Sequence, residues 1–129
     1  MKTAIDTNIL IRLLTADNKS LLQKAERLIS NHSTNEIFIA YGVILETYFV
    51  LKSFYKWENG VILDALQHIL NADEFHVEHE AALHLAITKA RKDQSFYDAV
   101  IGEVGAVRNL KTYTFDKRLK KNSSFTVLT

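Results

Sequence analysis

Short runs rich in β-branched and aromatic residues alternate along this chain with longer segments whose apolar residues recur at helical spacing. Residues 36–40, Glu-Ile-Phe-Ile-Ala, have the composition of a strand, whereas residues 80–92 repeat aliphatic residues about one helical turn apart. Strands that alternate with helices build βα units, in which helices cover both faces of a mainly parallel sheet. The sequence therefore predicts an α/β fold with a central, mainly parallel sheet flanked by helices, an α/β/α sandwich.

The same patterns assign an approximate extent to each element. Strands are expected at residues 2–5, 36–40, 111–114 and 125–128, with a further short strand at 75–77. Helices are expected at residues 7–15, 21–30, 42–55, 61–70, 80–92 and 97–108, and a turn or short helix at 116–120. The last long helix is rich in small residues, which let a helix lie close to a sheet. Because no linker, repeat or low-complexity stretch interrupts the sequence, we expect a single domain over residues 1–129.

The composition excludes several classes of protein. The chain has no cysteine, which rules out a disulfide scaffold, thiol catalysis and a cysteine-ligated zinc site. No apolar run approaches the roughly 18 residues that a membrane-spanning helix needs, and the first residues do not form a basic region followed by a long apolar segment. We therefore expect a cytoplasmic protein with no membrane partner.

The basic residues are unevenly distributed. Residues 89–121 contain nine Lys or Arg against four Asp or Glu, whereas residues 1–88 contain seven bases against eleven acids. A basic segment on a chain whose net charge is only +1 suits a polyanionic partner. The alternative is an ordinary solvated helix surface.

Two aspartates follow strand-like runs at opposite ends of the chain. Asp6 comes directly after residues 2–5, and Asp116 ends the run Lys-Thr-Tyr-Thr-Phe-Asp. The carboxyl ends of parallel strands lie at one edge of a sheet, where ligands bind in open α/β folds. Two carboxylates brought together there repel each other unless a divalent cation neutralises them. The alternative for Asp6 is that it, or Thr7, merely caps the following helix.

Two further acids lie on expected helices. Glu46 shares a helical face with apolar residues at positions 43, 49 and 50, and burying an unpaired carboxylate is costly. Its partner is therefore either a metal ion or a cation such as Arg12. Asp98 lies in the first turn of the helix expected at 97–108, where the helix dipole alone favours an acid. Taken together, the four acids predict one oxygen-rich site of the kind that holds Mg²⁺ or Mn²⁺.

Four short motifs resemble those of one known family. They are Ile5-Asp-Thr-Asn-Ile-Leu10 followed by Arg12, Leu13 and Leu14; Val43-Ile-Leu-Glu-Thr47; Phe96-Tyr-Asp-Ala-Val-Ile101; and Thr114-Phe-Asp116. Each motif is weak alone, but their order, their spacing and the chain length together resemble PIN domains, especially the VapC-type toxins. The resemblance covers nearly the whole chain.

The resemblance implies a Mg²⁺- or Mn²⁺-dependent endoribonuclease, the toxin of a type II toxin–antitoxin pair. It also implies an RNA substrate, a cognate antitoxin protein that inserts a segment near the site, and a homodimer. The catalytic and metal-binding quartet that it implies is Asp6, Glu46, Asp98 and Asp116. No member of this quartet is missing, which argues against a degenerate binding module.

The resemblance and general chemistry suggest further roles. Asn8 and Thr114 match polar residues that orient the metal-binding carboxylates without binding the metal ion themselves. Arg12, Lys117 and Arg118 are candidate RNA phosphate contacts, although each can equally be an ordinary surface base. We expect Asp6 and Asp98 to lie closest to the main metal ion; Glu46 either ligates, directly or through water, or acts as the base.

Two other functions compete with the nuclease. A metal-dependent phosphohydrolase that acts on a small phosphate ester would also carry an Asp at a strand end. That class favours a second acid two residues later, where this chain has Asn8. The other competitor is a non-catalytic PIN-like binding module, against which the complete set of acids argues.

Overall fold

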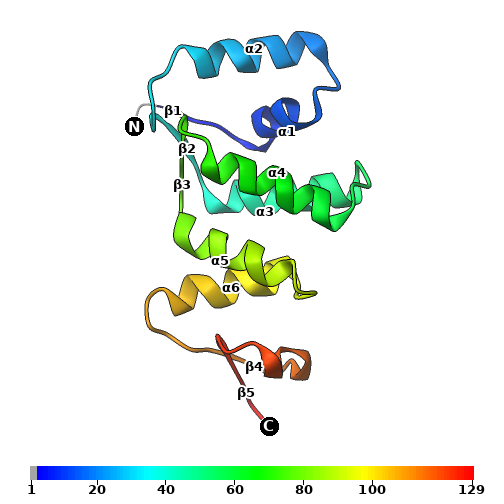
Figure 1. Cartoon of the computed structure of the whole chain (residues 1–129), viewed down its shortest axis with the longest axis vertical. Coiled ribbons are helices and arrows are strands. Elements are labelled where there is room, and N and C mark those ends of the chain that lie inside the picture. Colours follow the sequence, from blue (N-terminus) through cyan, green and yellow to red (C-terminus); the bar gives the residue numbers. More distant parts are fainter. Residues whose placement is uncertain (1–2) are drawn as a thin grey trace. The chain divides into compact units, whose positions relative to one another are not determined.

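The computed structural model describes residues 3–129 and divides the chain into two compact units. The first unit ends at Glu80 and the second begins at Ala81, and each contains its own parallel sheet (Figure 1). The α/β class and the parallel pairing predicted from the sequence are confirmed; the single-domain organisation stays a prediction. None of the helices within residues 3–129 has both the length and the apolar character that crossing a membrane requires.

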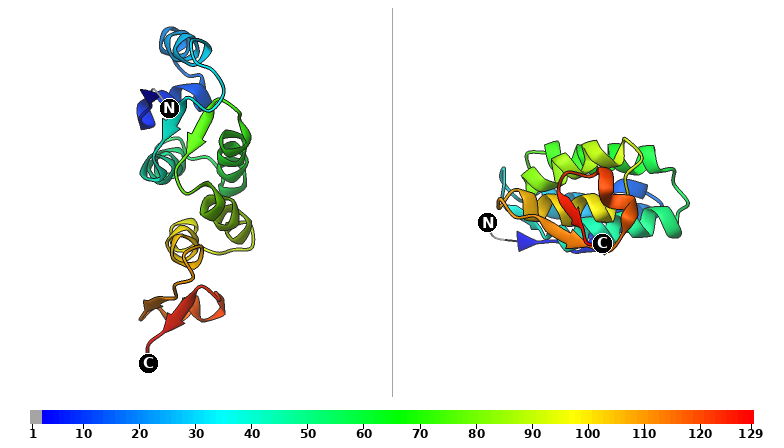
Figure 2. Two further views of the ribbon diagram at one scale, coloured as in Figure 1. Left: turned by 90° about the vertical axis from the view of Figure 1, so that its left-hand side faces the viewer. Right: turned by 90° about the horizontal axis from the view of Figure 1, so that it is seen from below.

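The first unit contains three parallel strands joined by pairs of helices. Its elements are β1 (Thr3–Ala4), α1 (Thr7–Thr15), α2 (Lys19–Ser30), β2 (Ile37–Ile39), α3 (Tyr41–Ser53), α4 (Asn59–Asn71) and β3 (Phe75–Val77). The strand order is β1-β2-β3, and Figure 2 shows the arrows of β2 and β3 side by side and pointing the same way. Lys2, the first residue of the strand expected at 2–5, lies outside the described residues.

The core of the first unit forms around β2. Ile37 and Ile39 on this central strand are fully buried, and so is Leu10 on α1. Strands that are buried on both faces carry continuous apolar runs, and β2 is the run Ile-Phe-Ile. α3 packs against both α1 and α4. Because α1 follows β1 and α3 follows β2, these two helices begin at the carboxyl edge of the parallel sheet.

The second unit contains two helices and a two-stranded parallel sheet. Its elements are α5 (Glu80–Ala90, whose first residue belongs to the first unit), α6 (Phe96–Ala106), β4 (Thr112–Thr114), the 3₁₀ helix η1 (Lys117–Lys121) and β5 (Phe125–Val127). β4 and β5 pair in register from Thr112 with Phe125 to Thr114 with Val127. η1 provides the crossover that lets two neighbouring strands run in parallel. All helices and strands expected from the sequence are confirmed, with ends shifted by one or two residues.

α6 lies very close to the chain around β5, as its small residues predict. A Cβ atom added at Gly102 would lie 2.7 Å from Phe125 Cε2 and 3.1 Å from Ser124 Cβ. At Gly105 the added Cβ would lie 2.9 Å from Thr112 Oγ1. Such distances are below normal van der Waals contact, so glycine is required at both positions by packing and not by backbone conformation.

Gly102→Ala is therefore expected to destabilise the protein by about 1–3 kcal/mol, because Phe125 is buried and its ring must move. The matched control is Gly60→Ala on α4, where an added Cβ meets nothing within 4 Å. There the better helix propensity of alanine should stabilise by about 0.5–1 kcal/mol. Urea denaturation of both variants measures the difference. Equal effects at the two positions would contradict the close approach of α6.

The turns of the chain rely on residues other than glycine. Within residues 3–129, all positive-φ positions are occupied by non-glycine residues: Ala16, Asn35, Lys56, His79, Asp93 and Asn109. Lys56, with φ of 59°, follows α3, and the next residue, Trp57, donates its N–H to Leu51 C=O at 3.0 Å, which satisfies a carbonyl at the end of that helix. The four glycines lie instead inside helices α3, α4 and α6.

Candidate active site

Asp6 occupies the point where β1 ends and α1 begins. Ile5 before it is buried, and Asp6 itself is exposed with an extended backbone, the usual conformation of an N-cap. Its Oδ1 accepts from Ile9 N–H at 3.3 Å. The capping alternative is therefore confirmed for one oxygen of this carboxylate. Because the cap uses Oδ1 alone, capping and ligation by the other oxygen are compatible.

Glu46 is hydrogen-bonded to Thr7, the residue that follows Asp6 in the chain. The hydroxyl of Thr7, which is buried, donates a hydrogen bond to Glu46 Oε1. This bond links the first residue of α1 to the middle of α3, and the two helices pack together. The first unit thus holds two of the four predicted acids on adjoining elements, with Thr7 as a link that the sequence did not indicate.

The prediction that the Glu46 face of α3 is buried is wrong within this unit. The buried residues of α3 are Ile44, Thr47, Tyr48 and Leu51, whereas Glu46 and Phe49 are exposed. α3 is apolar on most of its circumference, so residue spacing alone did not identify the side that faces the core. Glu46 is therefore held by the hydroxyl of Thr7 at an accessible position.

The alternative pairing of Glu46 with Arg12 is also wrong. Arg12 Nη1 binds Asp17 Oδ1 at 2.8 Å, across the turn that joins α1 to α2. Asp17 also accepts from the hydroxyls of Tyr55 and Thr15, at 2.7 and 3.0 Å. The Tyr55 hydroxyl, followed by Arg12, holds the pKa of Asp17 below its ordinary value. Arg12 thus has a structural partner, and its predicted contact with RNA phosphate stays untested.

Asp116 follows β4 and caps η1. Its carboxylate accepts three hydrogen bonds, all from Arg118: backbone N–H at 2.9 Å, Nε at 3.0 Å and Nη2 at 2.7 Å. These bonds, with the charge of the guanidinium, hold the pKa of Asp116 below its ordinary value. Thr114 Oγ1 accepts from Asp116 N–H at 3.0 Å, so Thr114 fixes the backbone of this residue.

Asp98 lies in the first turn of α6, which Ser95 caps by accepting from Asp98 N–H at 3.4 Å. Asp98 and Arg118 line the same cavity of about 560 Å³ in the second unit. The pKa of Arg118 is raised, first by its bonds to Asp116 and also by the negative charge of Asp98. The second unit thus brings Asp98, Arg118 and Asp116 into one electrostatic cluster.

The other predicted residues lie beside these two pairs. Asn8 is exposed in the first turn of α1, two residues after Asp6. Lys117 is exposed at the start of η1, next to Asp116. Their predicted roles, orientation of carboxylates and contact with RNA phosphate, stay predictions.

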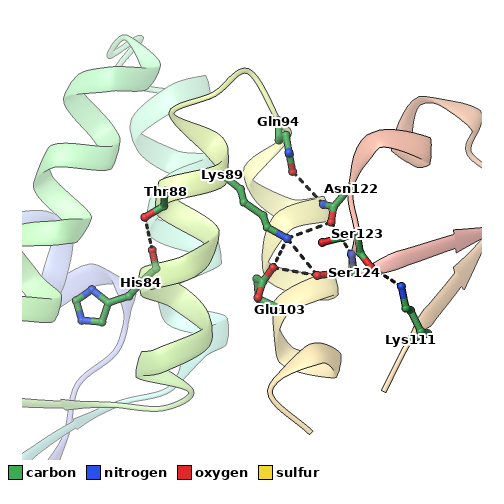
Figure 3. Close-up of polar contacts among 9 residues, drawn as sticks. All are labelled: His84, Thr88, Lys89, Gln94, Glu103, Lys111, Asn122, Ser123 and Ser124. Carbon is green, nitrogen blue, oxygen red and sulfur yellow. Dashed lines mark hydrogen bonds and ion pairs between the residues drawn. The ribbon is translucent and has the colours of Figure 1, made fainter. Parts of the chain in front are cut away.

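A buried polar network in the second unit was not anticipated from the sequence. Lys89 on α5 forms an ion pair with Glu103 on α6, and its Nζ also donates to Asn122 Oδ1 at 3.2 Å and Ser124 Oγ at 3.1 Å (Figure 3). Glu103, Asn122 and Ser124 are 4%, 4% and 6% exposed. Asn122 also lines the cavity that contains Asp98, so the network supports one wall of the candidate site.

The four predicted ligands are divided between the two units. Asp6 and Glu46 lie in the first, and Asp98 and Asp116 in the second. Among the described residues, no three His, Cys, Asp or Glu side chains within either unit form a group that could hold a metal ion. The donor chemistry is entirely carboxylate, which suits Mg²⁺ or Mn²⁺. A four-carboxylate centre requires the two pairs to meet, and that stays a prediction.

Two known proteins are similar to this chain over most of its length. A VapC ribonuclease from Aquifex aeolicus (strain VF5) is 28% identical over 121 residues, which cover 91% of this chain and 89% of that protein. A solved toxin–antitoxin complex from Klebsiella pneumoniae matches 98% of this chain and 97% of its own, with 14% identity and a TM-score of 0.38.

The family assignment does not rest on the similarity to the toxin–antitoxin complex. The sequence model of the PIN domain matches residues 3–124, a segment that contains all four acids and both sheets. The predicted resemblance is therefore confirmed over nearly the whole length: the chain belongs to the PIN domain family.

Proposed function

We propose that this protein is a Mg²⁺- or Mn²⁺-dependent endoribonuclease, the toxin of a type II toxin–antitoxin pair. The observation that carries the proposal is the placement of the four acids. Asp6 and Asp116 follow parallel strands, Asp98 opens a helix, and Glu46 is bonded to the residue next to Asp6. They occur in this order within the segment matched by the PIN domain. The similarity to a VapC ribonuclease supports RNA as the substrate.

The four carboxylates would hold the divalent ion, with Asp6 and Asp98 nearest to it and Glu46 and Asp116 completing the site. Such an ion lowers the pKa of bound water and neutralises charge that develops on the attacked phosphate. The remaining work belongs to the residues of the chain, which hold the carboxylates and the RNA backbone in a fixed geometry.

Thr7 and Thr114 hold two of the acids. The hydroxyl of Thr7 occupies Oε1 of Glu46, which orients the second oxygen of that carboxylate for ligation or for accepting a proton from water. Thr114 accepts from the backbone N–H of Asp116 and so keeps this residue in the extended conformation that caps η1. Each threonine thus fixes the position of one acid through a hydrogen bond that forms within the protein itself.

Arg118 provides the cation for phosphate. Its planar fork already binds the Asp116 carboxylate through two nitrogens, and the same fork matches two oxygens of a phosphodiester. The side chain is 88% exposed, so it is accessible to a polymer. Lys117 and Arg12 complete the proposed phosphate contacts. The proposal further includes a cognate antitoxin, a homodimer and a cytoplasmic location, as in VapC-type toxins.

The test offers the purified protein a single-stranded RNA and, separately, p-nitrophenyl phosphate, each with Mg²⁺. We expect internal cleavage of the RNA that chelation by EDTA abolishes, and no release of p-nitrophenolate. Hydrolysis of the small ester without RNA cleavage would replace the proposal by a small-molecule phosphohydrolase. Binding of RNA or protein partners without cleavage of either substrate would indicate a binding module.

A further inference from the structure

The cavity of about 560 Å³ in the second unit is lined by two basic residues, Lys92 and Lys121, that the function proposed above does not use. Lys92, Arg118 and Lys121 line it, together with Asp93 and Asp98, so its charged side chains sum to +1. Four of the five residues of η1, which supplies part of this lining, are basic. The volume is within the range of about 300–1,000 Å³ that is usual for pockets that bind small ligands.

The neutral wall of this cavity is held by the buried network of Lys89. Asn122 Oδ1 accepts from Lys89 Nζ at 3.2 Å and from Ser124 N–H at 2.9 Å. The amide nitrogen of Asn122 therefore faces the other way, and it donates to Gln94 Oε1 at 2.9 Å (Figure 3). With its oxygen engaged, Gln94 is left with its NH₂ group as the outer end of the chain of bonds, on the wall of the cavity.

The direction of these bonds follows from the chemistry of Lys89. An ammonium group has three donors and no acceptor, so every group that contacts it must present an oxygen. Asn122 accepts from Lys89 with its amide oxygen and donates to Gln94 with its amide nitrogen, so the N–H donors of this series point away from Lys89. Gln94, which lines the cavity, therefore has N–H donors available for a ligand there, and Lys92, Lys121 and Arg118 add positive charge. Both features select an anion that accepts hydrogen bonds.

We propose that this cavity is a subsite for a phosphodiester of the RNA backbone, adjacent to the phosphate that is cleaved. The inference rests on the proposed nuclease function and adds Gln94, Lys92 and Lys121 to the residues that bind RNA. Asp98, one of the proposed metal ligands, lines the same cavity, so an RNA strand that binds here lies beside this acid. Asp93 and Asp98 limit the net charge of the cavity. That balance favours a diester, with one negative charge, over a free phosphate monoester with nearly two.

The experiment replaces the N–H donor of Gln94 by an acceptor and removes the positive charge of Lys121. Gln94→Glu keeps the size of the side chain and the oxygen that accepts from Asn122, but replaces the outward donor by an acceptor. Its control is Gln23→Glu, the same change on the exposed face of α2. Lys121→Gln is matched by Lys120→Gln, which removes an equal charge from the same 3₁₀ helix outside this cavity.

Binding of a fluorescent single-stranded RNA of about 12 nucleotides is measured by anisotropy in EDTA, which prevents cleavage, between about 50 and 200 mM salt. We expect Gln94→Glu to weaken binding about tenfold and Lys121→Gln about fivefold. Lys121→Gln should also reduce the slope of log K against log salt by about 0.7, the value for one phosphate on a single strand. Both controls should stay within about twofold of the parent. Melting curves verify that each variant is folded; Lys121 is exposed, so its substitution provides the measurement if Gln94→Glu does not fold.

The outcomes separate this inference from the nuclease proposal. If the parent cleaves RNA but both variants bind like their controls, the subsite is disproved and the nuclease stands. If the parent neither binds nor cleaves RNA, both proposals fall. A parallel titration with adenosine monophosphate distinguishes the source of the phosphate. Effects on that monoester that equal or exceed those on RNA would overturn the assignment to the polymer backbone.

Discussion

Asp6→Asn is expected to reduce RNA cleavage by about 10³-fold with Mg²⁺ in excess, because a lost metal ligand removes about 4 kcal/mol of transition-state stabilisation. The fold should not change. Asparagine is as good an N-cap as aspartate, and its Oδ1 can accept from Ile9 N–H as Asp6 does. Loss of activity without loss of stability would therefore distinguish a catalytic carboxylate from a capping one. The measurement is single-turnover cleavage of RNA, with thermal denaturation in parallel.

The control for this variant is Asp73→Asn, the same exchange at an exposed position between α4 and β3. It should cleave RNA at the parental rate. An Asp6→Asn protein that retains activity within tenfold of the parent would overturn the placement of Asp6 at the metal site. A comparable loss in Asp73→Asn would show that negative charge on the first unit matters in general, independently of the site.

Glu103→Leu is expected to destabilise the protein by about 3 kcal/mol, which lowers its melting temperature by roughly 10 °C. The substitution leaves Lys89 without its counter-ion beside Asn122 and Ser124. We expect a loss of stability at the lower end of the range for buried ion pairs, because the side chain of Lys89 is 24% exposed and water can partly solvate its charge. Urea denaturation monitored by circular dichroism measures it.

The double variant Lys89→Met with Glu103→Leu tests the cause. Replacing both charges by apolar groups of similar size removes the unpaired ammonium, so most of the lost stability should return. A double variant that is as unstable as the sum of its two single variants would contradict coupling between them. Because this pair also orients Asn122 and Gln94, the double variant should bind RNA less tightly than the parent even when its stability is restored.

Periodicity and residue type were sufficient to predict the fold class. The run Ile-Phe-Ile of β2 is too apolar for an exposed strand, and it is the buried centre of the three-stranded sheet. The small residues of α6 correctly predicted a close approach, which Gly102 makes to Phe125. The ends of elements were less well predicted, because caps such as Asn18, one residue before α2, look like ordinary turn residues in sequence.

The buried carboxylate of this chain is Glu103 and not Glu46. Glu46 lies on a helix that is apolar almost all round, and its side chain is exposed in its unit. Glu103 shares the buried face of α6 with Ala99, Val100 and Gly102. Small neighbours on one face would have been the signal, since they indicate which side of α6 meets the rest of the unit.

The rest of the site could not be read from the sequence for a physical reason. The bonds from Lys89 to Asn122 and Ser124 join residues 33 and 35 positions apart, with a helix, a strand and a 3₁₀ helix between them. Their formation depends on tertiary distances of tenths of an ångström, which residue spacing does not encode. The order of the four acids was visible through the family resemblance, whereas their convergence into one site depends on tertiary structure and stays a prediction.

The absence of glycine from the left-handed turns at residues 3–129 has a consequence for work with this protein. At Lys56, the left-handed backbone costs an L-residue roughly 1 kcal/mol that glycine would not incur. Replacing this exposed lysine by glycine should therefore raise the stability of the protein without changing any of the proposed catalytic acids. Lys56→Gly offers a sturdier parent in which disruptive changes at the acids, or at the buried lysine, can be studied without losing the folded protein.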